Sequence, residues 1–388
     1  MSRRERISSS ESEDNTTGFR HRTRDVARDL LRTRTLIKSD KPLPEGALQG
    51  SVITSVGTHW IVAVGEIWYV CMVSGTLDVP HTGTLIAVGN IVWIIPADRQ
   101  SDDPLFREIM IPGMSPIPGD NDSRNNPIPG DNDSRNEADD PTGTIVRVEE
   151  RVTLLSRKAA GRVMREQVLV ANVDQLAVVV SFVEPNYHRR LIDRYLIAAD
   201  KGDLKPIIVL NKVELIPHEY LQDIVDDFEP YSKGLGIDVH FVSAATGGGL
   251  DTLRQALSGR STLFSGPSGV GKSTIINTLT DGQLRVGAVS RKYEKGRHTT
   301  TAAVSIPVDE HSSVVDSPGL REFAIWELDA NELPWYFEEF TSFIEQCHYT
   351  PCTHTHEPGC AVKGAVEKGL IDEGRYESYV LLRNDLLG

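Results

Sequence analysis

The chain has 388 residues, of which 39% are hydrophobic, and this supplies enough apolar material for two or three packed domains. No apolar run approaches the roughly 20 residues of a membrane-crossing helix, so we expect no membrane partner. The formal net charge of −14 argues against a nucleic-acid partner, but ten acids and three bases lie between residues 100 and 142, so the total says little about the folded parts.

Residues 1–46 are rich in arginine, serine and acidic side chains, and they lack the apolar segment of a secretory signal. A segment of this composition cannot bury enough apolar surface to offset the entropy of folding. We therefore expect a disordered tail on a cytoplasmic protein.

Short runs rich in valine, isoleucine, tryptophan and threonine follow, separated by glycine at the turns. They read GSVITSV, HWIVAVG, IWYVCMV, LIAVGNIVWIIP and GTIVRVEERVTLL. Five short strands of this kind predict a small barrel over residues 47–156, and an oligonucleotide/oligosaccharide-binding (OB) barrel is the leading candidate. The alternative is another small β-barrel that makes no contact with nucleic acid.

The barrel sequence is interrupted by an insertion, residues 100–142, that contains a tandem repeat. PIPGDNDSRN at 116–125 recurs at 127–136. Pro, Gly, Asp, Asn and Ser dominate both copies, so neither copy can bury a core, and we expect a disordered loop. The glycine and the distal glutamate of an EF-hand calcium loop are absent.

Residues 157–330 alternate between strand-like and helix-like segments. Helix patterns at 188–202, 221–234 and 249–257 lie between strand patterns at 168–182, 205–212, 238–244 and 262–265. Such alternation predicts a parallel sheet that is covered by helices on both faces.

A phosphate-binding loop, GPSGVGKS, begins at Gly266 and matches G-x-x-x-x-G-K-[ST]. Its backbone N–H groups and the following helix N-terminus would surround the phosphates, Lys272 would reach the β- and γ-phosphates, and Ser273 would bind Mg²⁺. The strand TLFS before the loop and the helix TIINTL after it give the context that this motif requires. The predicted loop residues are Gly266, Pro267, Ser268, Gly269, Val270, Gly271, Lys272, Ser273 and Thr274.

Two further segments favour guanine over adenine as the base. In NKVE, at 211–214, a carboxylate from Glu214 can accept hydrogen bonds from N1–H and the amino group of guanine, while Asn211 braces the loop and the Lys212 stem covers the ring. In VSAATGGGL, at 242–250, Ser243 and Ala244 are predicted to form a second base loop, with the Ala244 N–H facing the guanine oxygen.

Glu214 occupies a position where GTPases usually carry aspartate. The extra methylene keeps the charge and lengthens the reach, so the effect on guanine affinity ranges from nothing to about 3 kcal/mol. A surface glutamate without a role in base recognition is the alternative.

The segment VVDSPG, at 314–319, ends a strand with D-x-x-G, so Asp316 can serve the Mg²⁺ shell and the Gly319 N–H can reach the γ-phosphate. The motif order, with both base loops before the phosphate loop, is a rotation of the usual GTPase order. Rotation preserves a site assembled in space if the old termini lie close together.

This order, with a barrel in front and a Cys/His cluster behind, closely resembles the circularly permuted, small-ribosomal-subunit-dependent GTPases, the ribosome biogenesis GTPase A family. The resemblance covers about residues 50–388 without the insertion. Its carriers are NKVEL, SAATGGGL, GPSGVGKST, GRHTTT, DSPGLREF and CTHTHEPGC. It implies a circularly permuted P-loop GTPase domain and contacts of the barrel and zinc domain with ribosomal RNA (rRNA). It also implies GTP hydrolysis during late maturation of the small subunit.

GRHTTT, at 296–301, fits the first switch of such a GTPase. A threonine there would complete the Mg²⁺ shell beside Ser273 and Asp316; Thr299 and Thr300 are both candidates, and Thr300 is preferred. His298 is a candidate for positioning the attacking water. The alternative is that His298 is a polar loop residue with no catalytic role. Residue 320 is leucine, which cannot orient water as the glutamine of Ras-like enzymes does, so we expect slow intrinsic hydrolysis.

Three cysteines and a histidine lie within fourteen residues near the end of the chain: Cys347, Cys352, His354 and Cys360. Three thiolates and one imidazole form a closed set for one tetrahedral structural zinc ion. His348 and His356 compete for the nitrogen position, and the family pattern selects His354. Residues 331–388 are therefore predicted to be a helical zinc-binding domain.

Together the segments predict a multidomain α/β protein that hydrolyses GTP to GDP with Mg²⁺. The resemblance implies that it binds the small ribosomal subunit and its rRNA, and we expect a monomer. One alternative is a P-loop ATPase or kinase. The other is a nucleotide-gated RNA-binding module with negligible catalysis, which Leu320 favours.

Overall fold

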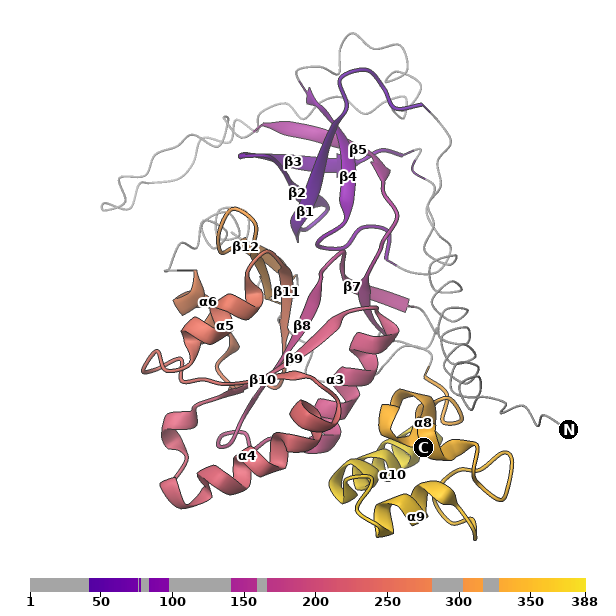
Figure 1. Cartoon of the computed structure of the whole chain (residues 1–388). Helices are drawn as coiled ribbons and strands as arrows, with labels where there is room; N and C mark the ends of the chain where they lie inside the picture. The colour runs from indigo at the N-terminus through magenta and orange to yellow at the C-terminus, as the bar shows by residue number, and fades with distance from the viewer. Residues whose placement is uncertain are drawn as a thin grey trace, which may run out of the picture.

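The computed structural model describes residues 42–75, 77, 84–97, 141–158, 166–280, 303–316 and 328–388. Figure 1 shows a barrel at one end, a sheet with flanking helices in the middle, and a helical C-terminal part beside helix α3. No helix in these ranges has the length and apolarity that crossing a bilayer requires.

The barrel is closed and has the strand order β1-β2-β3-β5-β4. Its strands are β1 (Leu48–Val56), β2 (His59–Val64), β3 (Ile67–Val73), β4 (Ile91–Pro96) and β5 (Thr142–Val148). Strands β3 and β5 pair in parallel and the other neighbours are antiparallel, so the connections form a five-stranded Greek-key barrel of the OB type. Val52, Val62 and Ile94 fill its interior.

The central sheet has six strands in the order β10-β9-β8-β11-β13-β12. They are β8 (Gln175–Ser181), β9 (Lys205–Asn211), β10 (Asp238–Phe241), β11 (Ser261–Ser265), β12 (Val304–Pro307) and β13 (Ser313–Asp316). All pairings are parallel except that of β12 with β13. A separate antiparallel pair, β6 (Leu154–Lys158) and β7 (Glu166–Ala171), precedes the sheet.

Both faces of the sheet are covered, which explains why strand β8 is buried along its whole length. Its even-numbered residues Leu176, Val178 and Val180 pack in the cluster that contains α3 (Arg189–Lys201) and α4 (Leu221–Glu229). Its odd-numbered residues Ala177 and Val179 pack in the cluster that contains α5 (Leu250–Leu257) and α6 (Lys272–Leu279). This three-layer arrangement confirms the predicted α/β class.

Several element boundaries differ from the expected ones. The run at 168–182 forms two strands, β7 and β8, because Asn172 adopts a left-handed backbone conformation between them (φ 51°). The barrel run at 85–96 is a strand only over Ile91–Pro96, and the run at 143–155 is divided between β5 and β6. Helix α4 ends at Glu229 and continues as a π-helical turn, Pro230–Gly234.

The C-terminal part consists of short 3-10 turns (Leu333–Tyr336 and Glu338–Phe340) and the helices α8 (Thr341–Ile344), α9 (Ala361–Glu367) and α10 (Glu373–Leu387). Helix α10 packs on α3. Arg375 of α10 pairs with Asp193 of α3, and their side chains are 4% and 0% exposed. Arg375 also donates from Nε and Nη2 to Glu339 at 2.7 and 3.1 Å.

In the opposite direction, Arg189 of α3 pairs with Asp372, the N-cap of α10, and with Asp227 of α4. Each of the two helices therefore contributes one arginine to an ion pair that joins α3 to α10. Burial raises the pKa of Asp193, and the charge of Arg375 opposes this shift. Asp193 thus depends on Arg375 to stay ionised inside the protein.

We predict that Arg375→Ala lowers the free energy of unfolding by about 3–5 kcal/mol, because it leaves the Asp193 carboxylate buried without a cation. Arg194→Ala is the control, since Arg194 and its partner Asp385 are 29% and 42% exposed and such pairs contribute about 0–1 kcal/mol. Urea unfolding followed by circular dichroism measures both changes. Equal, small losses in the two variants would contradict this account of the α3–α10 junction.

Candidate nucleotide site and metal centre

The predicted nucleotide-binding segments all follow the carboxyl ends of strands in one sheet. The loop after β9 carries NKVE, the loop after β10 carries SAATGGG, the loop after β11 carries GPSGVGK, and β13 ends at Asp316. Because these four strands run in parallel, their carboxyl ends lie at the same edge, where open α/β sheets bind ligands. The rotated order along the chain therefore produces one site in space.

The phosphate loop connects β11 to α6 and depends on glycine at two positions. Gly266 has φ +150°, and a Cβ there would lie 2.0 Å from the Val179 carbonyl oxygen. Gly271 has φ +92°, and a Cβ there would lie 2.3 Å from Nδ2 of Asn211. A side chain at either position would displace the loop from its neighbours. Ser268 and Gly269 are exposed, Val270 is buried, and Ser273 and Thr274 are exposed in the first turn of α6.

Lys272 and Asp316 form the charged part of this edge. Lys272 Nζ donates hydrogen bonds to the Gly266 and Pro267 carbonyl oxygens at 2.9 and 2.8 Å. Burial raises the pKa of Asp316, and the charge of Lys272 opposes the shift. A cation and a carboxylate that influence each other beside a glycine-rich loop are arranged as Mg²⁺–phosphate binding requires.

Asn211 joins three of the segments. Its Nδ2 donates to the Val270 carbonyl oxygen of the phosphate loop at 2.8 Å, and its Oδ1 accepts from the Ala244 N–H of the second base loop at 3.0 Å. The residue is 2% exposed. Ser243 shapes the second base loop from within, since its Oγ accepts from the Thr246 N–H at 3.1 Å.

Lys212 has a left-handed backbone (φ +65°), and Nζ donates to the carbonyl oxygens of Glu184 at 2.7 Å and Val183 at 3.4 Å. Glu214 is exposed in the short 3-10 turn Val213–Leu215 that follows. The Lys212 contacts add the loop after β8 to the site. A Cβ on Gly269 would also lie 3.5 Å from the Glu184 carbonyl oxygen.

Sequence reasoning missed this loop, residues 182–186, because it contains no recognised motif. Its position at the carboxyl end of the fully buried strand β8 was the available signal. Three predicted residues, His298, Thr300 and Gly319, lie outside the described residues, as do Thr299 and Leu320.

The predicted metal ligands come together in the C-terminal part. One ligand atom from each of Cys347, Cys352, His354 and Cys360 lies within 4.8 Å of all the others. His354 Nδ1 is 3.5 Å from the sulfurs of Cys347 and Cys360, and those two sulfurs are 3.9 Å apart. Tetrahedral zinc with bonds of about 2.3 Å to sulfur and about 2.05 Å to nitrogen places S···N pairs about 3.5 Å and S···S pairs about 3.8 Å apart. The cluster therefore fits one metal ion.

The surroundings of the cluster fix the backbone between its ligands. The Tyr376 and Tyr379 hydroxyls donate to the carbonyl oxygens of His354 and Thr353 at 2.8 and 2.6 Å. Burial opposes ionisation of Glu357, yet hydrogen bonds from Thr353 and Thr355 lower its pKa to about 2. Burial raises the pKa of Cys352 to about 12, so a bound cation is needed to keep this thiol ionised.

The two competing histidines lie apart from this cluster. His356 is exposed and its Nδ1 pairs with the Thr355 hydroxyl at 3.0 Å. The His348 ring lies against Tyr349, and a Cβ at Gly359 would lie 3.1 Å from the Cβ of His348. Among the described residues, only His354 joins the three cysteines.

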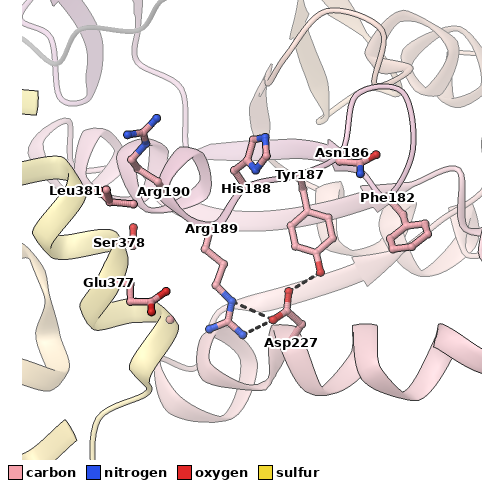
Figure 2. A pocket seen from close by; sticks show the side chains of 11 residues that line it. Phe182, Asn186, Tyr187, His188, Arg189, Arg190, Asp227, Glu377, Ser378 and Leu381 are labelled. Atoms are coloured by element: carbon pink, nitrogen blue, oxygen red, sulfur yellow. Dashed lines mark hydrogen bonds and ion pairs between the residues drawn. The ribbon is translucent and has the colours of Figure 1, made fainter.

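A cavity of about 650 Å³ lies between α10 and the part of the central domain formed by the loop after β8, α3 and α4. Figure 2 shows residues of the loop after β8, of α3 and of α4 facing α10, with Asp227 accepting hydrogen bonds from Tyr187 and Arg189. Its lining includes two arginines, Arg189 and Arg190, and two carboxylates, Asp227 and Glu377. It contains none of the predicted nucleotide-binding residues.

Comparisons with known proteins agree with this geometry. The family model described as RsgA GTPase matches residues 148–326. The Small ribosomal subunit biogenesis GTPase RsgA of Gemmatimonas aurantiaca is 41% identical over 248 residues, which cover 64% of this chain and 80% of the relative. The protein of the same name from Chlorobaculum parvum is 43% identical over 249 residues, 63% of this chain and 79% of the relative.

Two solved structures are also similar. The crystal structure of YjeQ from Thermotoga maritima has a TM-score of 0.61 at 29% identity and covers 88% of this chain and 99% of its own. The structure of YloQ, described as a circularly permuted GTPase, has a TM-score of 0.58 and covers 90% of this chain and 98% of its own. At 21% identity, YloQ shows the shared fold alone.

We predict that the purified protein carries about one metal ion per chain and that Cys352→Ser and His354→Ala lose it, because each removes one of four ligands from a closed set. His356→Ala is the matched control and should retain the metal, since its ring lies outside the cluster. Elemental analysis after gel filtration measures the content. Retention of metal by His354→Ala together with loss by His356→Ala would mean that the ligand set is wrong.

Proposed function

This chain belongs to the RsgA GTPase family, and on that premise we propose that it hydrolyses GTP to GDP and phosphate during late maturation of the small ribosomal subunit. We further propose that it contacts the small ribosomal subunit through rRNA and acts as a monomer. We also propose that it works in the cytoplasm, where the small subunit would be assembled. The domain limits given above, 47–156, 157–330 and 331–388, are part of this proposal.

The observation that carries the proposal is the pair of hydrogen bonds of the Asn211 side chain, which donates to the Val270 carbonyl oxygen and accepts from the Ala244 N–H. They connect the loop of the proposed base-recognising carboxylate, the second base loop and the phosphate loop. An ATPase or kinase would have no need for a carboxylate loop fastened to its phosphate loop in this way, because adenine has neither the N1–H nor the 2-amino group of guanine that the carboxylate recognises. The arrangement therefore supports GTP over ATP.

In this proposal, residues 266–274 surround the phosphates, and Lys272 neutralises charge that develops on the γ-phosphate. Ser273, Asp316 and Thr300 complete the Mg²⁺ shell, Gly319 contacts the γ-phosphate, and His298 positions water. Position 320 is leucine, which cannot orient the water as a glutamine at this position would. We therefore propose that the ribosomal subunit accelerates a slow intrinsic reaction.

The metal in the Cys/His cluster is proposed to be one structural Zn²⁺ ion. Three thiolates and one imidazole are the ligands that zinc accepts in closed structural sites, and they leave no position for a catalytic water. The ion would stabilise the segment between α8 and α9, which contains no described helix or strand of its own.

We predict that Lys272→Ala reduces subunit-stimulated GTP turnover by at least about 100-fold, because a charge-assisted contact with the transition state is lost. Ser273→Ala should weaken Mg²⁺ binding, so that more Mg²⁺ is needed for half-maximal turnover, and it should also lower turnover. Asn277→Ala, on an exposed position of the same helix, is the control and should behave as wild type. Phosphate release measured with and without purified small subunits makes the comparison, and wild-type turnover in Lys272→Ala would exclude the assignment.

A second prediction concerns base recognition by Glu214. Glu214→Gln replaces one acceptor with a donor, so GTP affinity should fall by roughly 10- to 100-fold, the value of a charged hydrogen bond. Affinity for xanthosine triphosphate should rise relative to GTP, because xanthine presents an oxygen where guanine has its amino group. Glu214→Asp should bind GTP no better if the loop is adapted to the longer side chain.

The control for this experiment is Glu219→Gln, which neutralises another exposed acid in the following 3-10 turn (His218–Tyr220). Titration calorimetry with both nucleotides gives the affinities. Equal GTP affinity in wild type and Glu214→Gln, with no gain for xanthosine triphosphate, would show that another residue recognises the base.

A further inference from the structure

Among the described residues, a threonine that no motif includes joins the barrel to the central sheet by a buried hydrogen bond. Thr54 Oγ1 of β1 donates a hydrogen bond of 3.0 Å to the carbonyl oxygen of Ala303, and this bond is buried. Thr54 is 3% exposed and Ala303 is 9% exposed. Ala303 directly precedes strand β12, whose neighbour β13 ends at Asp316.

A bulge in β1 directs this side chain out of the barrel. The register of β1 with β2 pairs Val52 with Val62 and then Thr54 with Ile61, so Ile53 is an extra residue. Opposed residues share a face of a sheet, and faces alternate from one pair to the next. Because Val52 and Val62 lie in the barrel core, Thr54 and Ile61 lie on the outer surface. Without the extra residue, Thr54 would face inward.

The outer surface at this point is nevertheless buried, because the central sheet covers it. Ile61 is 2% exposed although it lies outside the barrel core cluster. Trp68 of β3, paired with Ala63 on the same outer face, packs against the sheet core beside Val304. Figure 1 shows this end of the barrel next to β12.

The anchored position lies next to the proposed Mg²⁺ side of the nucleotide site. In the register of β12 with β13, Val304 pairs with Asp316. The residues that precede Ala303 in sequence include GRHTTT, 296–301. A displacement of the barrel would therefore act on the start of β12, at a point one residue from the partner of Asp316.

We propose that Thr54 is a positioning residue that holds the start of β12 and transmits engagement of the barrel by an RNA-bearing partner to the Mg²⁺ side of the nucleotide site. This inference rests on the proposed subunit-stimulated GTPase function and adds the route by which stimulation reaches the site. The hydrogen bond from the Thr54 hydroxyl to the Ala303 carbonyl oxygen is the step of that route at which the barrel meets the sheet. Thr54 itself contacts neither nucleotide nor Mg²⁺ in this proposal.

The test compares Thr54→Val, which keeps the branched shape and removes the donor, with Thr54→Ser, which keeps the donor. In Thr54→Val, turnover at saturating small subunits should fall by roughly 3- to 10-fold, the effect of one lost hydrogen bond. Intrinsic turnover, GDP affinity and the subunit concentration for half-maximal stimulation should remain as in wild type. Thr54→Ser should restore the stimulated rate.

A control separates positioning from general loosening of the barrel. Val52→Ala removes buried apolar volume two residues away and should lower the melting temperature without changing the stimulated rate of the folded protein. Hydrogen–deuterium exchange gives a readout besides activity, since the amides of residues 304–306 should exchange faster in Thr54→Val and not in Thr54→Ser.

Full stimulation of Thr54→Val, or an equal loss in Val52→Ala, would overturn this inference while leaving the GTPase function intact. A wild-type chain that small subunits do not stimulate would instead overturn the proposed function, and the inference with it. Unchanged exchange at 304–306 in Thr54→Val would show that the hydrogen bond does not hold β12.

Discussion

The nucleotide site depends on the two hydrogen bonds of the Asn211 side chain. One end of this amide holds the phosphate loop at Val270 and the other end holds the second base loop at Ala244. Loops of this kind carry many backbone groups with no partner in a strand, and a buried amide that serves two of them fixes their spacing. The Asn211 amide approaches Gly271 so closely that a Cβ at position 271 would collide with it, so this placement of Asn211 requires glycine there.

The same principle, a buried polar group that joins separate units, recurs at both ends of the molecule. At one end Arg375 and Asp193 join α10 of the C-terminal part to α3, and at the other Thr54 joins the barrel to the residue that precedes β12. Lys212 ties the loop after β8, which leads directly into α3, to the base side of the site. The sheet at the centre is therefore connected by specific, directional contacts to both of the flanking regions that are proposed to engage rRNA.

What could be predicted from sequence was local. The segment of the phosphate loop, the cluster of candidate metal ligands and α3 follow from short patterns set by neighbours in the chain, and the structure has a strand–loop–helix at the first, a Cys/His cluster at the second and a helix at the third. The division of 168–182 into two strands was missed because the turn uses Asn172 and contains neither Gly nor Pro. The hydrogen bond of Thr54 with Ala303 and the pairing of Arg375 with Asp193 join residues more than a hundred positions apart in sequence, so no local pattern encodes them.

The central claim is that motifs in rotated order form one GTPase site whose slow chemistry is accelerated by the small ribosomal subunit. The most direct test is the rate of phosphate release from GTP by the wild-type protein as purified small subunits are added. This account predicts a low rate for the protein alone and a saturable rise with subunits, with no comparable rise when ATP replaces GTP. A rate that is independent of the subunits, or an equal response with ATP, would contradict it.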